Sequence, residues 1–139
     1  MNCIFCRILA GEAEASFLYR DELCAAFMDV QPVTPGHLLV IPIAHAVGLA
    51  DLDPATGAHI FQVGQRLAAA LKTSGLPCNG IDLFLADGAE AGQTVFHAHL
   101  HVIARVKGDG FGFRFPPGYP QHPPRTTLDA QAESIRRGL

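Results

Sequence analysis

The stretch Phe96-His97-Ala98-His99-Leu100-His101-Val102-Ile103 places three histidines at alternate positions of an otherwise apolar run. Alternation is the period of a β-strand, so His97, His99 and His101 are expected on one face of a strand. The residues between them are apolar and would pack on the core. A strand of this kind predicts that its three imidazoles line a cleft.

Three histidines could suggest a single metal site, but strand geometry argues against it. At roughly 3.3 Å per residue, His97 and His101 begin about 13 Å apart, whereas an imidazole nitrogen binds zinc at roughly 2 Å. At most two of the three can therefore share one metal ion. One or two imidazoles remain for chemistry, and an imidazole titrating near neutral pH can act as nucleophile, proton donor or ligand.

The composition is that of one ordinary folded domain, with 139 residues of which 49% are hydrophobic. The formal net charge of −3 and the lack of a long Lys/Arg run argue against binding to nucleic acid through bulk electrostatics. The N-terminus lacks the features of a secretion signal, and no run of about eighteen apolar residues is present. We therefore expect a cytoplasmic protein that binds neither nucleic acid nor membrane.

Cys3 and Cys6 form a C-x-x-C motif, whereas Cys24 and Cys78 lie in apolar surroundings and are expected to be small core residues. In the cytosol such a pair is more often a metal ligand than a disulfide. Thioredoxin-like chemistry would need a strand before the motif, for which there is no room. A finger-type zinc site would need a nearby histidine, and His37 lies too far away. Further ligands must come from distant segments, unless the motif is a chance occurrence.

The rest of the chain predicts four more strands and one main helix. The strands are expected at 17–19, 23–30, 37–42 and 81–86, from apolar runs bounded by turn residues. The helix opens with Asp53 as N-cap and Pro54 at its first position, and Gly75 ends it. His59 is expected at the surface of this helix. Its buried stripe is expected to be Ile60, Val63, Leu67, Ala70 and Leu71.

Two segments lack a regular period. The loop 87–92 is rich in small residues and leads into the histidines, so Gly92, Gln93 and Thr94 could meet a phosphate; an ordinary hairpin turn is the alternative. Residues 108–124 are rich in Gly and Pro and precede a short helix predicted at 127–137. Such a segment is usually functional or bound to a partner. We expect a single domain over 1–139, with its core at 1–107 and a tail at 108–139.

Together these motifs resemble the histidine triad (HIT) family of nucleotide hydrolases and transferases. The run from His97 to Ile103 has its H-x-H-x-H-x-x pattern with apolar residues at x. Four further blocks match in the same order: the C-x-x-C start, residues 29–42, His45 and residues 92–95. The segment 108–113 resembles the bacterial, zinc-containing branch of that family. The likeness covers nearly the whole chain.

The resemblance implies an α+β, HIT-like fold, with an antiparallel sheet of about five strands, one main helix and a short C-terminal helix. It also implies a homodimer that pairs through the main helix and an adjacent strand. Ala55, Ala58 and Phe61 add apolar surface beside the predicted stripe, which agrees with such an interface. The tail from Gly108 would then reach toward the other subunit's cleft.

In the reaction of this family, the middle histidine attacks the α-phosphorus of a nucleotide ester, anhydride or phosphoramidate, which makes His99 the nucleophile. His101 and His37 would stabilise the charge that develops on the phosphate, and no catalytic metal would be required. Asp29 corresponds to the acid that binds the ribose hydroxyls, and residues 92–94 would bind the phosphate. The substrate would be a purine nucleotide or nucleotide conjugate, dinucleoside polyphosphates included. Without the resemblance, Asp29 could simply cap its loop and His37 could be a solvated strand end.

The resemblance also implies a zinc site. The bacterial branch holds zinc through two N-terminal cysteines, a histidine after the third strand and the first histidine of the triad. Two thiolates and two imidazoles form a closed tetrahedral site, which is structural rather than catalytic. The corresponding residues are Cys3, Cys6, His45 and His97.

Two departures bear on substrate choice. Ala86 stands where the nucleoside-phosphoramidase branch has an asparagine, and the chain has no tryptophan, whereas that branch has one near its C-terminus. Neither departure affects the nucleophile. The sequence leaves two alternatives open: a non-catalytic nucleotide-binding regulatory protein of the same fold, and a zinc-stabilised interaction domain.

Overall fold

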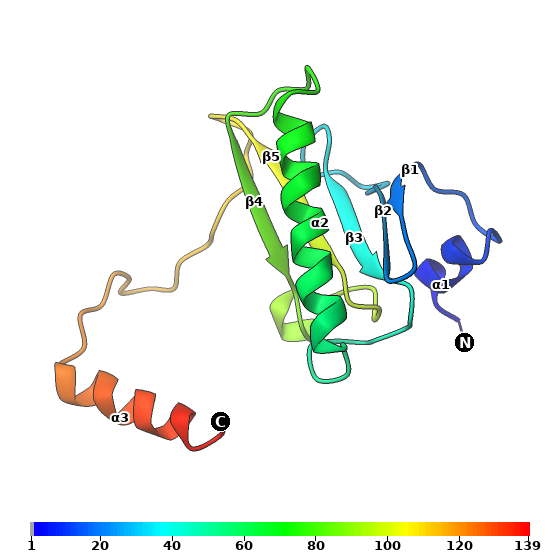
Figure 1. Ribbon diagram of the computed structural model, residues 1–139. Helices are drawn as coiled ribbons and strands as arrows, with labels where there is room; N and C mark the ends of the chain where they lie inside the picture. Colours follow the sequence, from blue (N-terminus) through cyan, green and yellow to red (C-terminus); the bar gives the residue numbers. More distant parts are fainter. Residues whose placement is uncertain (1) are drawn as a thin grey trace.

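The computed structural model describes residues 2–139 and folds them around a five-stranded antiparallel sheet (Figure 1). The strand order is β1-β2-β3-β5-β4, and every neighbouring pair is antiparallel. The elements are α1 (Ile4–Leu9), β1 (Phe17–Arg20), β2 (Cys24–Met28), β3 (Leu38–Pro42), α2 (Pro54–Lys72), β4 (Gly80–Leu85), the 3₁₀ turn η1 (Ala89–Ala91), β5 (Leu100–Arg105) and α3 (Arg125–Arg136). The predicted α+β fold is confirmed, and apart from β5 the element ends differ from the predicted ones by one or two residues.

Helix α2 covers one face of the sheet. Asp53 caps it by accepting a hydrogen bond from the Thr56 N–H at 2.9 Å, as the sequence predicts. Ile60, Val63 and Leu71 are buried against the sheet, whereas Ala70 is exposed, so the predicted stripe is wrong at its last but one position.

Gly64 takes a place on the buried side of α2 that the predicted stripe leaves out. A β-carbon built on Gly64 would lie 2.8 Å from Leu100 Cδ2, closer than real β-carbons approach such an atom. The glycine weakens the helix intrinsically, but it lets α2 lie close to β5. This close approach helps to close the core on that side of the sheet.

His59, predicted at the surface, is instead half-buried and joins α2 to the turn between β1 and β2. Its Nε2–H donates to Asp21 Oδ2 at 2.6 Å, and the Tyr19 hydroxyl donates to the same oxygen at 2.6 Å. Burial opposes ionisation of Asp21, but the hydrogen bonds from Tyr19 and His59 outweigh it and hold the pKa of this carboxyl well below its usual range. The prediction failed because the helix period cannot show that a turn carboxylate lies opposite His59.

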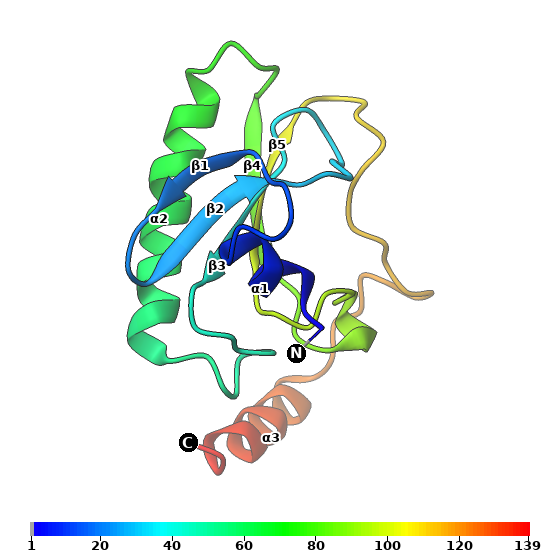
Figure 2. The same cartoon turned by 90° about the vertical axis from the view of Figure 1, so that its right-hand side faces the viewer.

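The other face of the sheet carries a second apolar cluster under helix α1, and Figure 2 shows α1 and α2 on opposite sides of the sheet. Alternation along β2 divides the two clusters: Cys24 and Ala26 face α2, and Ala25 and Phe27 face α1. Cys24 is fully buried, as predicted, and Cys78 is partly buried at the edge of the α2 cluster.

Strand β5 is shorter than the sequence predicts. Val40 pairs with Leu100, so Pro42 would face Ala98 if the ladder continued. Proline has no N–H to donate, and the Ala98 N–H donates instead to Ala46 O at 2.7 Å. His97 and His99 therefore precede the strand, which begins later than predicted. The three imidazoles still share one side of the chain, because Phe5 of α1 meets the rings of His97 and His99, and the rings of His99 and His101 lie 4.8 Å apart. Only His99 and His101 line the cavity described below. The prediction that the residues between them pack on the core is confirmed.

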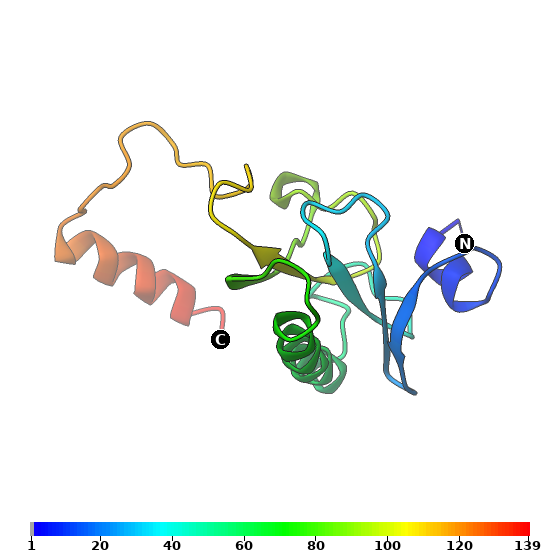
Figure 3. The same cartoon turned by 90° about the horizontal axis from the view of Figure 1, so that it is seen from above.

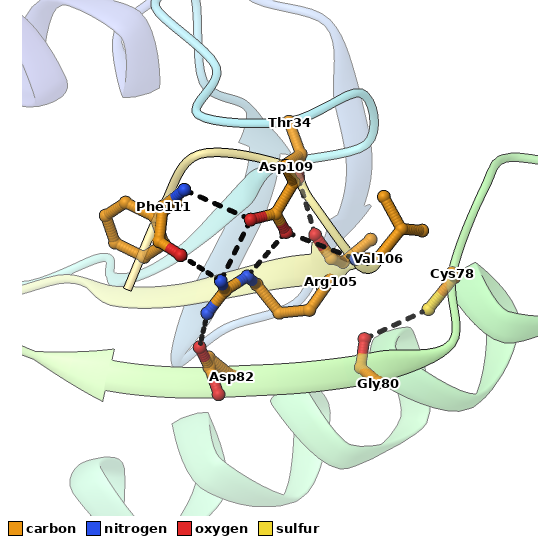
Figure 4. Close-up of polar contacts among 9 residues, drawn as sticks. Thr34, Cys78, Gly80, Asp82, Arg105, Val106, Asp109 and Phe111 are labelled. Atoms are coloured by element: carbon orange, nitrogen blue, oxygen red, sulfur yellow. Dashed lines mark hydrogen bonds and ion pairs between the residues drawn. The ribbon is translucent and has the colours of Figure 1, made fainter. Parts of the chain in front are cut away.

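After β5 the chain leaves the sheet, and Figure 3 shows the tail and α3 standing apart from it. Arg105, the last residue of β5, fixes the departure (Figure 4). Its guanidinium donates to Asp82 Oδ2 at 2.6 Å, to both carboxylate oxygens of Asp109 at 2.7 and 3.0 Å, and to the Phe111 carbonyl. Within residues 2–139, no helix is long and apolar enough to cross a membrane.

Candidate active site and metal-binding cluster

Four side chains from three distant segments meet beside α1. Cys3 is the N-cap of α1 and Cys6 lies in its first turn, His45 follows β3, and His97 precedes β5. Their ligand atoms all lie within 4.8 Å of one another. The structure thus brings together the four residues that the resemblance assigned to zinc.

The spacing within this cluster fits a tetrahedral zinc ion. With bonds of roughly 2.0 Å to nitrogen and 2.3 Å to sulfur, ligand atoms lie about 3.3 to 3.8 Å apart. His97 Nδ1 lies 3.5 Å from Cys3 Sγ, 3.6 Å from Cys6 Sγ and 3.2 Å from His45 Nδ1. His45 Nδ1 lies 3.4 Å from Cys6 Sγ. The donor set and these four distances are compatible with one tetrahedral zinc ion.

The surroundings prepare His97 to be a ligand. Its Nε2–H donates to the Pro42 carbonyl at 2.8 Å, which leaves the lone pair on Nδ1, the atom that faces the cysteines. Burial lowers the pKa of His97, so the imidazole is neutral at pH 7. Burial raises the pKa of the Cys6 thiol, and the adjacent Cys3 adds to this effect. A bound cation would reverse the preference of the thiols, because coordination favours the thiolate.

His99 is buried and held in one tautomer. Its Nδ1 lies 2.7 Å from the backbone carbonyl of His97. A carbonyl oxygen can only accept, so Nδ1 carries a proton, and in the neutral form of the ring Nε2 has the lone pair. An imidazole fixed in this way presents an available nucleophilic nitrogen.

A chain of hydrogen bonds sets the tautomers of His37 and His101. The Val33 N–H donates to His37 Nδ1 at 3.0 Å, so the proton of His37 is on Nε2. His37 Nε2 lies 2.9 Å from His101 Nδ1 and donates to it. The remaining nitrogen of His101 therefore carries a proton and can donate a hydrogen bond to a ligand. Burial lowers the pKa of His37 and lowers that of His101 to about 4, so both rings are neutral at pH 7.

This tautomer argument also bears on a second group of potential ligands. Asp29, His37 and His101 bring their ligand atoms within 4.8 Å of one another. A metal would need a lone pair on His37 Nε2, which the Val33 contact leaves protonated. The three residues are therefore better suited to hydrogen bonding than to coordination.

A cavity of about 230 Å³ lies between α1, the end of β2 and the histidines. Its lining combines apolar side chains, among them Ile4, Phe5, Ile8 and Phe27, with polar ones, among them Asp29, Thr94, His99 and His101. This combination suits a ligand with an aromatic or apolar part and an anionic part. A nucleoside phosphate has both.

Asp29 caps its loop and also lines the cavity. Its Oδ1 accepts from the Gln31 N–H at 2.8 Å, so it caps the loop after β2. Its Oδ2 lies 3.5 Å from His37 Nε2, and the residue lines the cavity. One carboxylate oxygen thus remains for a ligand hydroxyl. His37, with a side chain only 3% exposed, is not a solvated strand end.

The loop before the histidines differs from the prediction. Gln93 is buried, and its amide accepts from the Gly88 N–H at 2.8 Å and donates to Val47 O at 2.6 Å. Its side chain therefore holds the loop, and contact with phosphate is not supported. The Gly92 N–H donates to Ala89 O, and Gly92 does not line the cavity. Of the three predicted phosphate-binding residues, only Thr94 reaches it.

Two phenylalanines beside the histidines escaped the sequence analysis. Phe84 stacks on His101, with ring centroids 4.2 Å apart and an interplanar angle of 15°. Phe5 meets His99 edge-to-face at 5.2 Å. Phe84 and His101 are paired residues of β4 and β5, so the strand register would have predicted the first contact, but the sequence does not give that register. The sequence carries no signal for the second.

Several known proteins are similar to this chain in sequence and fold. The HIT domain family model matches residues 10–108. The crystal structure of a HIT family protein from Bacillus anthracis is 39% identical and has a TM-score of 0.89, over 99% of this chain and 97% of that one. A zinc-bound histidine triad family protein from Mycobacterium smegmatis is 47% identical over 84% of each chain, with a TM-score of 0.77. Adenylylsulfatase HINT3 of Arabidopsis thaliana is 34% identical over 109 residues, which are 78% of this chain and 54% of that protein.

Proposed function

The chain belongs to the HIT domain family, and on that premise we propose that it is a nucleotide hydrolase or transferase acting at the α-phosphate of a nucleotide conjugate. The observation that carries the proposal is the contact between His99 Nδ1 and the His97 carbonyl, which leaves the lone pair on Nε2. His99 lines the cavity, whose apolar and polar side chains suit a nucleoside phosphate. The similarity to an adenylylsulfatase supports chemistry of this class.

The proposed reaction has two steps. His99 Nε2 attacks the α-phosphorus, a nitrogen–phosphorus bond forms, and the bond to the leaving group breaks, with the leaving group taking a proton. The protonated nitrogen of His101 donates to the phosphate as charge develops, and Thr94 offers a second donor. Water then attacks the phosphorus, which frees His99 and releases the nucleoside monophosphate. His37 acts through its hydrogen bond to His101.

For substrate binding, we propose that the purine base packs on the apolar wall of the cavity, against Phe5, Ile8 and Phe27. Asp29 would accept hydrogen bonds from the ribose hydroxyls through its Oδ2. The conjugates in question are phosphoramidates, esters and dinucleoside polyphosphates. Ala86 is buried and offers no polar side chain at a position where a related branch has one, so substrate preference should differ from that branch.

We also propose that Cys3, Cys6, His45 and His97 hold a structural zinc ion. The tetrahedral spacing of their ligand atoms supports this, as does the similarity to a zinc-bound protein. The ion would fix α1 to the segment after β3, which carries His45, and to the segment before β5, which carries His97. In this proposal the reaction itself needs no catalytic metal. A cytoplasmic location is proposed with it, because reduced thiols are required.

A homodimer is the last part of the proposal. Ala55, Ala58 and Phe61 are exposed on α2, and β4 is an edge strand that could pair with its symmetry mate. Helix α3 stands apart from the sheet, yet the Bacillus anthracis structure aligns with 99% of the chain. We propose that the tail packs on the partner subunit near its cleft.

The test of the function compares turnover of adenosine 5′-phosphoramidate by the wild-type protein and by His99→Ala. We expect AMP release by the wild type and a loss of at least about 1,000-fold in kcat for the variant. AMP binding, measured by calorimetry, should stay within a few-fold. Lys107→Ala is the control, because Lys107 is exposed and lies outside the cavity and the tail. AMP binding by the wild type without turnover would instead indicate the non-catalytic regulatory protein.

A further inference from the structure

Helix α1 belongs to the metal-binding cluster and to the nucleotide cavity at the same time. Cys3 and Cys6 supply two of the four potential ligands. The residues between and after them, Ile4, Phe5 and Ile8, form part of the apolar wall of the cavity. The two sites thus share neighbouring positions of the six-residue helix α1 and its N-cap.

Helix α1 is held by side-chain contacts and not by backbone pairing. A helix of six residues is not stable alone, and among residues 2–139 α1 shares no backbone hydrogen bond with the sheet. Phe5 and Ile8 are buried in the apolar cluster, Leu9 packs beside them, and the Arg20 guanidinium donates to Leu9 O at 3.0 Å. The metal-binding cluster and the contents of the cavity would add to this packing in setting the position of α1.

Phe5 is the residue that touches both sites. Its ring meets the ring of His97 edge-on, with centroids 5.7 Å apart, and that of His99 at 5.2 Å. On its other side it meets Phe27, which lines the same cavity, at 5.3 Å. A shift of α1 would move this ring away from the cavity wall and from the proposed nucleophile together.

We propose that Phe5 is a positioning residue through which metal binding and nucleotide binding strengthen each other. The proposal rests on the proposed function, since it assumes that a nucleotide occupies the cavity. Zinc on the four ligands orders α1 and so completes the wall on which the base packs. A nucleotide on that wall holds α1 where Cys3 and Cys6 can keep the metal. Because coupling between two binding events is reciprocal, each should change the other by the same factor.

The test measures zinc release from the zinc-loaded, folded protein to a chromophoric chelator, with and without saturating AMP. We expect AMP to slow release at least about fivefold. Reciprocity holds for equilibrium affinities, so the zinc affinity is also measured by competition with the chelator. Removal of zinc by dialysis should lower the AMP affinity, measured by calorimetry, by the same factor by which AMP raises the zinc affinity. If the zinc-free protein unfolds, its AMP affinity cannot be measured, and the zinc-release measurement tests the proposal by itself.

The informative variant is Phe5→Ala. Each protein is measured at an AMP concentration well above its own Kd for AMP. We expect it to bind one zinc ion per chain, but AMP should no longer slow zinc release, and Phe5→Leu should restore part of the effect. Phe17→Ala is the matched control, because Phe17 also packs on Phe27, at 5.9 Å, but does not line the cavity. It should keep the full AMP effect.

Two results would overturn the proposal. Unchanged zinc release from the wild type at saturating AMP would show that the sites are independent. An equal slowing in the wild type and in Phe5→Ala would show that AMP acts through global stability rather than through this ring. Failure of AMP to bind the zinc-loaded protein at all would remove the proposed function as well, which distinguishes the two failures.

Discussion

The two faces of the sheet are closed in different ways. On one face, the nineteen-residue helix α2 packs directly on the strands, with Gly64 allowing close contact, and the interior is a continuous apolar cluster. On the other face, the six-residue α1 covers a smaller cluster beside a cavity of about 230 Å³. The first face is stabilised by packing, with the hydrogen bond from His59 to Asp21 joining α2 to the β1–β2 turn. On the second face the cavity takes the place of apolar packing. A metal ion bound by the four-residue cluster would stabilise this face in its stead.

Removal of the metal should have the largest effect, because it should destabilise the α1 face and leave the α2 face intact. Chelation, or Cys3→Ser with Cys6→Ser, should lower the thermal midpoint by on the order of 10 °C, because closed zinc sites contribute several kcal/mol to folding. Hydrogen exchange should show lost protection in α1 and residues 95–99, while α2 keeps its protection. Cys78→Ala, outside the cluster, should retain the metal. Less than half a zinc ion per chain in carefully purified, stable protein would refute the structural role.

On the opposite face, Gly64→Val should destabilise the protein by about 2 kcal/mol, because the added side chain would overlap Leu100 and force α2 away from β5. Gly57→Ala is the matched control, since a β-carbon there meets Leu52 at an ordinary 3.4 Å and the helix propensity improves. It should be neutral or stabilising by up to about 1 kcal/mol. Urea unfolding measures both. Equal stability of Gly64→Val and the wild type would contradict the account of this face.

A smaller effect concerns acid. The pKa of His101 is lowered to about 4 by burial, with the neighbouring His99 and His37 adding to this and Asp29 opposing it. Between about pH 6.5 and 4 the folded protein binds fewer protons here than the unfolded chain. The contribution of His101 to the unfolding free energy should therefore be fully present above pH 6.5 and should decrease as the pH falls through this window. His101→Asn should reduce the slope, and His122→Asn, in the exposed tail, should leave it unchanged.

Much of the fold was predictable because its signals are local. Asp53 and Pro54 mark the start of α2, and short apolar runs mark the strands. The start of β5 was not predictable, because it depends on Pro42 facing Ala98 across a register that the sequence does not state. The half-buried His59 and the exposed Ala70 were missed because the helix period ignores the β1–β2 turn and the actual width of the sheet.

The site divides in a similar way. The alternating histidines indicated chemistry, and the C-x-x-C motif indicated a metal with distant further ligands. Only the resemblance identified these ligands as His45 and His97. Gln93 was assigned to phosphate from its position, whereas its buried amide bonds are formed with Gly88 and Val47. Phe5 and Phe84 carry no motif. Such contacts arise from tertiary packing, which periodicity cannot show.

The central claim is that His99 forms a covalent nucleotidyl intermediate, and mass spectrometry of the acid-sensitive adduct after rapid quenching tests it most directly. The wild-type protein mixed with adenosine 5′-phosphoramidate should carry one adenylyl group per chain, on the peptide that contains His99, and His99→Ala should carry none. An adenylyl group on His97 or His101, or steady turnover by His99→Ala at the wild-type rate, would contradict the account.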